Sequence, residues 1–278
     1  MKCTLCGETE FKIITNHLRH NITRNVVSCT KCSLTCLENP TEEDIDYESE
    51  YRKKHSPILD KELSPLEFYN LAKGIFQNRL EHIKPLLNPQ FNILEIGCAT
   101  GHFLDLIKDD VSKCVGLELN KEHAHFAKEH LNLEVYDKSL SDVDFPTQSF
   151  DVIFLFQVLE HIPDPISFLK LCRQYLKPTG KIYIEVPNID DALLSIYKVP
   201  QFKEFYFRLP HRYYYSKETL DKIMQKAGFI GSSSTIQEYS VFNHIHWLLT
   251  GKPQDDLRKG YSPVPINLDI DQSDIKQI

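Results

Sequence analysis

The stretch Phe91–Asn120, FNILEIGCATGHFLDLIKDDVSKCVGLELN, decides the fold of this 278-residue chain. Phe91–Ile96 is a short apolar run rich in strand formers, and Gly97–Gly101 predicts a tight turn directly after it. His102–Lys108 then has helical spacing, and Lys113–Leu119 predicts a second strand. A strand, a glycine turn, a helix and a second strand form the βαβ unit that holds nucleotide-like ligands.

Strands and helices alternate along the rest of the chain as well. Phe150–Phe156 (FDVIFLF) is a continuous apolar run, as expected of a strand buried on both faces of a parallel sheet. The alternation predicts an α/β fold with a Rossmann-like, doubly wound sheet. The other predicted elements are helices at Pro65–Leu87, Lys121–Leu131, Pro165–Leu176 and Lys217–Ala227, strands at Leu133–Tyr136 and Lys181–Val186, a turn at Pro178–Gly180, and a strand region at Phe229–Tyr239. Residues 240–278 show no pattern that places the last strand.

The composition is that of an ordinary globular protein, with 41% hydrophobic and 26% charged residues. A net charge of −7 argues against a protein that binds nucleic acid or an anionic membrane. No apolar run approaches the roughly 20 residues of a membrane span, and the N-terminus MKCTLCGETE lacks the apolar centre of a signal peptide. We therefore expect a cytoplasmic protein whose eight cysteines are reduced.

Residues 1–39 form a unit of their own, because four cysteines fall there in two Cys-x-x-Cys pairs. Cys3 with Cys6, and Cys29 with Cys32, can direct four thiolates at one tetrahedral ion, so they predict a structural zinc site. Short strands expected at Phe11–Thr15 and Arg24–Ser28 make the unit zinc-ribbon-like. The alternative is unpaired buried thiols, which is the interpretation that we give to Cys36.

Three further segments complete the expected domain organisation. Residues 40–88 form a helical linker or lid, in which Tyr47 and Tyr51 either pack the ribbon against the main domain or close over a ligand. Residues 89–278 form the Rossmann-like domain. Within it, residues 188–215 are rich in aromatic side chains and predict an insertion that covers the ends of the strands.

The spacing of small residues in the turn narrows the expected ligand. Gly97, Ala99 and Gly101 follow the acidic Glu95, while His102 stands where a dinucleotide-binding turn has its third glycine. This pattern resembles the first motif of the class I S-adenosylmethionine-dependent methyltransferases. The resemblance implies that the turn passes under the methionine portion of S-adenosylmethionine. Acidic residues suit the cationic end of that cofactor, and N–H groups of the turn and of the helix end can donate hydrogen bonds to its carboxylate.

The same resemblance implies a set of cofactor-binding residues. Glu118, at the end of the second strand, would bind the ribose diol. The adenine would lie against residues after the third strand, where either Asp137 reaches the ring nitrogen or Ser139 and Leu140 line the pocket. The full predicted set is Glu95, Gly97, Cys98, Ala99, Gly101, Phe103, Glu118, Leu119, Asp137, Ser139, Leu140 and Gln157.

Further motifs extend the resemblance through residues 91–229. They are FDVI from Phe150, QVLEHIPDP at Gln157–Pro165, IEVPN at Ile184–Asn188, and PHRYYYS at Pro210–Ser216. With the cysteine-rich N-terminus and FNHIHWLLTGKP (Phe242–Pro253), they resemble a bacterial branch that modifies sugars, nucleotide-linked sugars or surface-polysaccharide precursors. The resemblance implies O-methylation of a small sugar, nucleotide sugar or phosphorylated capsule precursor, with a small molecule as acceptor.

Two histidines are candidates for a general base that would deprotonate the acceptor. His161 follows the fourth strand, where open α/β sheets place ligands, and His211 lies in the covering insertion. Structural roles are the alternatives, a helix cap for His161 and a surface loop for His211. Arg212 either binds an anionic acceptor or forms a structural ion pair. His244, with Asn243 and Trp247, is a candidate for the border of the acceptor pocket.

Two other functions remain open at this point. An NAD-dependent oxidoreductase uses the same βαβ unit, although the absent third glycine argues against it. A non-catalytic zinc-ribbon adaptor with a degenerate cofactor fold is the other alternative, and the intact turn with Glu118 argues against that one.

Overall fold

A five-stranded parallel sheet forms the centre of the molecule in the computed structural model, which describes residues 1–41, 63–231, 233–236 and 241–253. The strand order is β6-β5-β4-β7-β8. After β4, the chain first adds strands on one side of it and then on the other, so the strand order switches beside β4. The predicted doubly wound α/β sheet is therefore confirmed. The strands are β4 (Asn92–Ile96), β5 (Lys113–Leu117), β6 (Glu134–Tyr136), β7 (Phe150–Phe156) and β8 (Leu176–Glu185).

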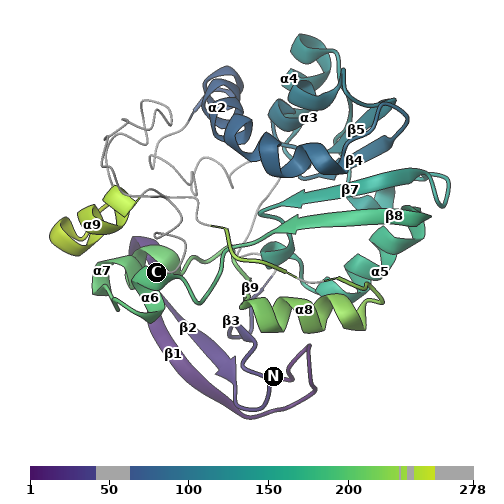
Figure 1. Cartoon of the computed structure of the whole chain (residues 1–278). Helices are drawn as coiled ribbons and strands as arrows, with labels where there is room; N and C mark the ends of the chain where they lie inside the picture. The colour runs from purple at the N-terminus through teal and green to yellow at the C-terminus, as the bar shows by residue number, and fades with distance from the viewer. Residues whose placement is uncertain (42–62, 232, 237–240, 254–278) are drawn as a thin grey trace.

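Helices cover both faces of this sheet (Figure 1). Alternate residues of a strand point to opposite faces, so Val152 and Phe154 pack with α2, α3 and α4, whereas Ile153 and Leu155 pack with α5 and α8. The two faces thus carry separate apolar clusters. The helices are α2 (Pro65–Ile83), α3 (His102–Ile107), α4 (Lys121–Leu131), α5 (Pro165–Tyr175) and α8 (Lys217–Lys226).

Side-chain caps fix where several of these helices begin. Ser64 and Glu67 form a reciprocal capping box at α2, and Pro65 occupies its first turn. Asn120 accepts from the His123 N–H at the start of α4, and Ser216 caps α8 together with Thr219. These polar residues place the helix starts close to the predicted positions.

A second, antiparallel sheet contains the cysteine-rich N-terminus. Its order is β1-β2-β3-β9, with β1 (Phe11–Leu18), β2 (Ile22–Cys29), β3 (Thr35–Leu37) and β9 (Tyr213–Tyr214). β9 belongs to the covering insertion, and it pairs Thr35 with Tyr214 and Cys36 with Tyr213. The sheet of the ribbon-like unit is thus completed by a strand from the far end of the chain, which the sequence did not reveal.

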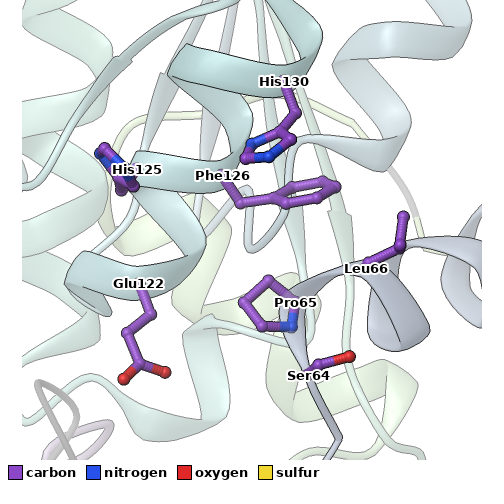
Figure 2. A pocket seen from close by; sticks show the side chains of 7 residues that line it. All are labelled: Ser64, Pro65, Leu66, Glu122, His125, Phe126 and His130. Carbon is purple, nitrogen blue, oxygen red and sulfur yellow. The ribbon is translucent and has the colours of Figure 1, made fainter.

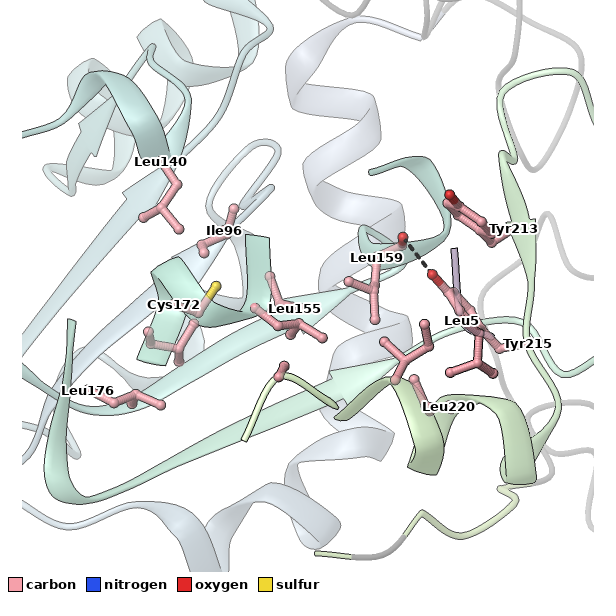
Figure 3. Packing of buried hydrophobic residues seen from close by; sticks show 14 of the residues in the cluster. Leu5, Ile96, Leu140, Leu155, Leu159, Cys172, Leu176, Tyr213, Tyr215 and Leu220 are labelled. Carbon is pink, nitrogen blue, oxygen red and sulfur yellow. Dashed lines mark hydrogen bonds between the residues drawn. The ribbon is translucent and has the colours of Figure 1, made fainter. Parts of the chain in front are cut away.

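The N-terminal unit and the main domain share one hydrophobic cluster. Leu5 lies with Leu159, Tyr215 and Leu220 in a cluster that continues to Leu155 in the central sheet (Figure 3). The cysteines at positions 3 and 29 belong to the same cluster. The two sheets therefore form one continuous body.

Short helices complete the covering insertion. α6 (Ala192–Ser195) and α7 (Pro200–Tyr206) lie next to α9 (Val241–Thr250), where Trp247 packs against Phe202 and Phe205 at ring-centroid distances of 5.1 Å. Trp247 is consequently a core residue, and the adjacent Asn243 is also buried. The single-turn helices are η1 (Arg19–Asn21), η2 (Lys84–Leu86), η3 (Leu140–Asp142) and η4 (Leu159–His161).

The structure differs from three predicted elements. Residues 178–180 lie inside β8 as an irregularity in its pairing with β7, because the strand resumes register at Lys181. The helix from Pro65 ends at Ile83, where Pro85 requires a change to the η2 turn. No strand forms at the described residues 229–231 and 233–236, and Ile230 is fully exposed there. Tyr47 and Tyr51 lie outside the described residues.

Two glycine substitutions test the packing with opposite expected signs. Gly101 has φ +74°, and a Cβ there would lie 2.6 Å from Leu133 Cδ1 and 3.1 Å from Ala127 Cβ. Gly101→Ala should therefore lower the free energy of unfolding by about 2–3 kcal/mol. Gly74, inside α2, has no heavy atom within 4 Å of its Cβ position, so Gly74→Ala should raise it by about 0.5–1 kcal/mol. Urea unfolding measures both, and a Gly101→Ala protein as stable as the wild type would contradict this packing.

Candidate functional site

The glycine turn after β4 has three left-handed positions in five residues. The φ angles are +76° at Gly97, +48° at Ala99 and +74° at Gly101. The N–H groups of Gly97 and Cys98 both donate to the carbonyl of Leu117, at 2.8 and 3.0 Å. These two amides therefore hold the turn against β5. The binding of a ligand carboxylate by other N–H groups of the turn and helix end remains a prediction.

Glu118 follows β5 and joins the turn to the start of α4. One carboxylate oxygen accepts from the Ala99 N–H at 2.8 Å, and the other accepts from the Asn120 N–H, also at 2.8 Å. Only 8% of Glu118 is exposed, so these two bonds compensate for the burial of its charge. The predicted ribose-binding residue therefore also fixes the shape of the turn.

Glu95 is a second buried carboxylate at the same edge of the sheet. It precedes the turn by two residues, is 1% exposed, and its Oε2 atom has no hydrogen-bond partner among the described residues. Burial raises its pKa well above the ordinary value, and the nearby charge of Glu118 raises that pKa further. A cation placed beside Glu95 would restore its ionised form.

The other predicted cofactor residues divide into core and surface positions. Cys98, Phe103 and Leu140 have side chains in the hydrophobic clusters, with at most 2% exposure. Any contact of Cys98 or Phe103 with a ligand would therefore involve the backbone. The remaining residues are at or near the surface: Leu119; Asp137, which pairs with Lys128; Ser139, which bonds Asp142; and Gln157, at φ +55°.

Helix α2 lies over the start of α3. Tyr69 donates to Asp105 at 2.5 Å, and Lys73 donates to the same oxygen at 2.7 Å. The ring of Phe76 contacts His102, which follows the turn, at a centroid distance of 4.6 Å. This helix thus packs against the outer side of the turn.

A surface hollow lies between the start of α2 and α4 (Figure 2). It is lined by Ser64, Pro65, Leu66, Glu122, His125, Phe126 and His130.

The structure brings both predicted histidines together beyond the end of β7. The rings of His161 and His211 are nearly perpendicular, with centroids 4.9 Å apart. Glu160 completes the group, with its Oε1 atom 3.7 Å from His161 Nε2. One ligand atom from each residue lies within 4.8 Å of the other two. We call these three residues the His–Glu cluster.

Hydrogen bonding and burial define the state of the His–Glu cluster. The carbonyl of Pro210 lies 2.8 Å from His161 Nδ1, and because a carbonyl only accepts, Nδ1 carries the proton. Neither oxygen of Glu160 accepts a hydrogen bond in the described part of the chain, and the residue is 1% exposed. Burial raises the pKa of Glu160 to about 8.

Residues 210–215, which we call the strap, attach this cluster to the N-terminal sheet. The Arg212 N–H donates to the carbonyl of Glu160 at 2.8 Å, while the Arg212 carbonyl accepts from Leu37 of β3 at 2.9 Å. Tyr213 donates to the carbonyl of Pro163 at 3.0 Å, and Tyr215 to that of Leu159 at 3.3 Å (Figure 3). The strap therefore positions His211 by bonds on both of its sides.

The side chain of Arg212 has a structural contact. It donates from Nη2 to the carbonyl of Thr41 at 3.2 Å, and the residue is 9% exposed. His244 contacts the ring of Tyr197 at a centroid distance of 6.5 Å. An anion-binding role of Arg212 and an acceptor-pocket role of His244 both remain predictions.

The four cysteines of the two pairs converge at the edge of the N-terminal sheet. The Sγ atoms of Cys3 and Cys32 lie 3.5 Å apart, as do those of Cys6 and Cys29, and all four lie within 4.8 Å of one another. Ser33, after the second pair, adopts φ +63°, where Gly7 after the first pair has φ +78°. Both pairs thus end in the same left-handed turn. Cys36 is buried in the same hydrophobic cluster but is not one of the four converging cysteines. Burial raises its pKa to about 12, and the nearby Cys3 and Cys29 contribute to this rise.

Sequence reasoning missed two residues of this region. Glu160 has no partner at a characteristic spacing in the sequence, so only its burial beside two imidazoles distinguishes it from a surface glutamate. Tyr213 lies in an aromatic run whose strand pairing depends on β3, more than 170 residues earlier. The sequence signal that was available for this site is His161, which follows the buried strand Phe150–Phe156 and stands next to an acidic residue.

Comparisons with known proteins identify the family. Residues 48–231 match the family described as methyltransferase domain. That match covers well over half of the chain, so the protein belongs to the methyltransferase-domain family.

The described residues contain no helix that is long and apolar enough to cross a membrane.

Individual relatives are similar over shorter stretches. A Mycolicibacterium smegmatis protein named probable S-adenosylmethionine-dependent methyltransferase is 32% identical over 35% of this chain and 38% of its own length. A ubiquinone biosynthesis O-methyltransferase of Haemophilus ducreyi is 26% identical over 40% of this chain and 52% of its own. The chain thus spans about half or less of these relatives. The crystal structure of a SAM-dependent methyltransferase from Archaeoglobus fulgidus has a TM-score of 0.48 at 24% identity, over 66% of this chain and 75% of that one.

The contacts of Asp105 predict that acid weakens the attachment of α2 to α3. Burial raises the pKa of Asp105, but hydrogen bonds from Lys108, Lys73 and Tyr69 outweigh it and lower that pKa to about 2. A carboxyl group whose pKa is lower in the folded than in the unfolded state stabilises the fold at pH values above its unfolded pKa of 3.8. This contribution is lost as the pH falls toward 2. Asp105→Asn should therefore cost about 2 kcal/mol near neutral pH and progressively less below about pH 4.

Chemical unfolding across this pH range measures the effect, with Asp109→Asn at an exposed position after α3 as the matched control. The control should change the free energy of unfolding by less than about 0.5 kcal/mol. An Asp105→Asn cost that is the same at low and neutral pH would contradict the assignment.

Proposed function

We propose that the protein is an S-adenosylmethionine-dependent methyltransferase that transfers a methyl group to an oxygen of a small acceptor. The observation that carries the proposal is the buried pair Glu95 and Glu118 on either side of the glycine turn, in a chain of the methyltransferase-domain family. The unpartnered Glu95 oxygen suits the ammonium or sulfonium of the cofactor, and Glu118 suits its ribose hydroxyls. Gly97, Ala99 and Gly101 would lie against the methionine portion.

Bound S-adenosylmethionine supplies a methyl group on a sulfonium, which is already a good leaving group. The chain then has to align the acceptor oxygen with the methyl–sulfur axis, an effect worth at most roughly 7–11 kcal/mol of barrier. As the carbon–sulfur bond breaks and the carbon–oxygen bond forms, the acceptor must lose its proton. The His–Glu cluster is the group that we assign to this loss, because it follows β7, whose carboxyl end lies beside that of β4.

Two considerations favour an oxygen acceptor, and a third favours an acceptor of glycan type. The relatives named ubiquinone biosynthesis O-methyltransferase are O-methyltransferases by name, and imidazoles suit the activation of a hydroxyl. The cysteine-rich N-terminus and the strap motif PHRYYYS resemble the branch that modifies sugars and surface-polysaccharide precursors. A small sugar, nucleotide sugar or phosphorylated precursor is therefore the acceptor class that we propose.

The four N-terminal cysteines fit a structural zinc ion. A tetrahedral ion with zinc–sulfur bonds of roughly 2.3 Å separates the sulfurs by roughly 3.8 Å, close to the 3.5 Å between the Sγ atoms of Cys3 and Cys32. Thiolates at this distance repel one another unless a cation lies between them. We propose that zinc holds β1–β3 in the form that pairs with the strap, which favours a cytoplasmic location with reduced thiols.

Calorimetric titration with S-adenosylhomocysteine tests the cofactor assignment. The wild type should bind it and should bind NAD more weakly or not at all. Glu118→Ala should weaken binding by about tenfold or more, because it removes both the ribose acceptor and the bonds that shape the turn. The matched control Glu129→Ala, at an exposed position of α4, should bind as the wild type does. Tighter binding of NAD than of S-adenosylhomocysteine would refute the proposal.

Elemental analysis tests the zinc site. Cys3→Ser should hold about one zinc fewer per chain than the wild type, because three thiolates bind the ion much less tightly than four. Cys114→Ser, at a half-buried cysteine of β5, should keep the wild-type content. Equal zinc in the wild type and in Cys3→Ser would show that the four cysteines do not hold the ion.

A further inference from the structure

We infer that the His–Glu cluster, Glu160 with His161 and His211, is a second metal site, which takes a divalent transition-metal ion such as Zn²⁺. This site is distinct from the four cysteines. Its role in methyl transfer rests on the proposed function, whereas its ability to bind metal does not.

The positions of the donor atoms suit such an ion. Bonds of roughly 2.0–2.2 Å to nitrogen and oxygen place the ligands of a tetrahedral ion roughly 3.4 Å apart. Glu160 Oε1 and His161 Nε2 are separated by 3.7 Å, and the whole group lies within 4.8 Å. Two imidazoles and one carboxylate are also the donor set of hydrolytic zinc sites, which keep a fourth position open.

The tautomer of His161 points to a cation between it and Glu160. When the ring is neutral, Nδ1 donates to the Pro210 carbonyl, and the Nε2 lone pair lies 3.7 Å from Glu160 Oε1. A lone pair and a carboxylate oxygen repel each other, and 3.7 Å is too long for a hydrogen bond between them. A backbone carbonyl that accepts from the other ring nitrogen, as that of Pro210 does here, is the usual support of a metal-binding histidine.

Glu160 gives independent support from its surroundings. It is 1% exposed, and neither of its oxygens accepts a hydrogen bond in the described residues. Burial raises the pKa of Glu160, and the charge of Arg208 lowers that pKa but does not offset the effect of burial. An ionised carboxylate buried in this way is costly unless it is paired or bound to metal. A metal ion held by the His–Glu cluster would satisfy one or both oxygens of Glu160.

The donor types narrow the ion. Two imidazoles favour zinc and its neighbours in the first transition series over Mg²⁺ and Ca²⁺, which prefer oxygen ligands. The four-cysteine site and this site would therefore both accept zinc, yet they differ in donors: four sulfurs in the first, and two nitrogens with one oxygen in the second.

A metal at this position would activate the acceptor in place of a free histidine base. The acceptor hydroxyl would take the open position, where a bound ion would lower the pKa of that hydroxyl. The oxygen–hydrogen bond breaks and the proton passes to water, the oxygen–methyl bond forms, and the methyl–sulfur bond breaks with its electrons left on sulfur. In this role, the two imidazoles act as ligands.

Metal content after equilibrium dialysis against ZnCl₂ tests the inference. The wild type should hold about two zinc ions per chain, whereas Glu160→Gln and His211→Ala should each hold about one. His82→Ala, at an exposed histidine of α2, is the matched control and should hold as many as the wild type. His211→Gln, which preserves more of the side-chain volume, serves as a second variant if His211→Ala does not fold.

Cobalt spectra separate the two sites. Co²⁺ bound by four cysteines gives intense sulfur-to-metal charge-transfer bands, whereas Co²⁺ bound by nitrogen and oxygen gives only weak d–d bands. Cys3→Ser should lose the former, and His211→Ala should lose only the latter. Wild-type zinc content in Glu160→Gln and both His211 variants, or one zinc in the wild type that disappears in Cys3→Ser, would overturn the second site. S-adenosylhomocysteine binding reports separately on the proposed function, because no ligand of either metal belongs to the cofactor turn.

Discussion

The antiparallel pairing of β3 with β9 joins the two halves of the functional region. Without the β3–β9 pairing, the strap would lose its strand partner in the N-terminal sheet. With it, the Arg212 backbone bridges Leu37 to Glu160, and His211 is held next to His161. The short β9 strand buries Tyr213 and Tyr214 almost completely, so apolar packing stabilises these few hydrogen bonds.

The site also contains three buried carboxylates. Glu95, Glu118 and Glu160 all lie at the carboxyl edge of the parallel sheet, and all are at most 8% exposed. Glu118 accepts hydrogen bonds from two backbone N–H groups, whereas in the described part of the chain one oxygen of Glu95 and both oxygens of Glu160 accept none. The pKa values of Glu95 and Glu160 are raised, chiefly by burial. Two buried acids with unbonded oxygens at one edge mark positions where a cationic ligand is favourable.

Much of the central sheet could be predicted from residue periodicity. Phe150–Phe156 and Lys121–Leu131 have the predicted bounds, because a doubly buried strand and an amphipathic helix each have a local pattern. The predicted elements differ from the structure where strand pairing outweighs the local sequence pattern. Residues 178–180 are drawn into β8 by β7, and Phe229 and its successors have strand-like composition but no strand beside them to pair with in the described chain.

The sequence by itself determined the α/β sheet, the glycine turn with its two acids, and the two cysteine pairs, since each depends on residues close together in the chain. Tertiary structure decided which side chains meet. It placed Phe103 and Cys98 in the core, bonded Glu118 to the turn, and brought Glu160 to two histidines. Such contacts depend on strand order and on β9 crossing to the N-terminal sheet, long-range pairings that no local spacing encodes.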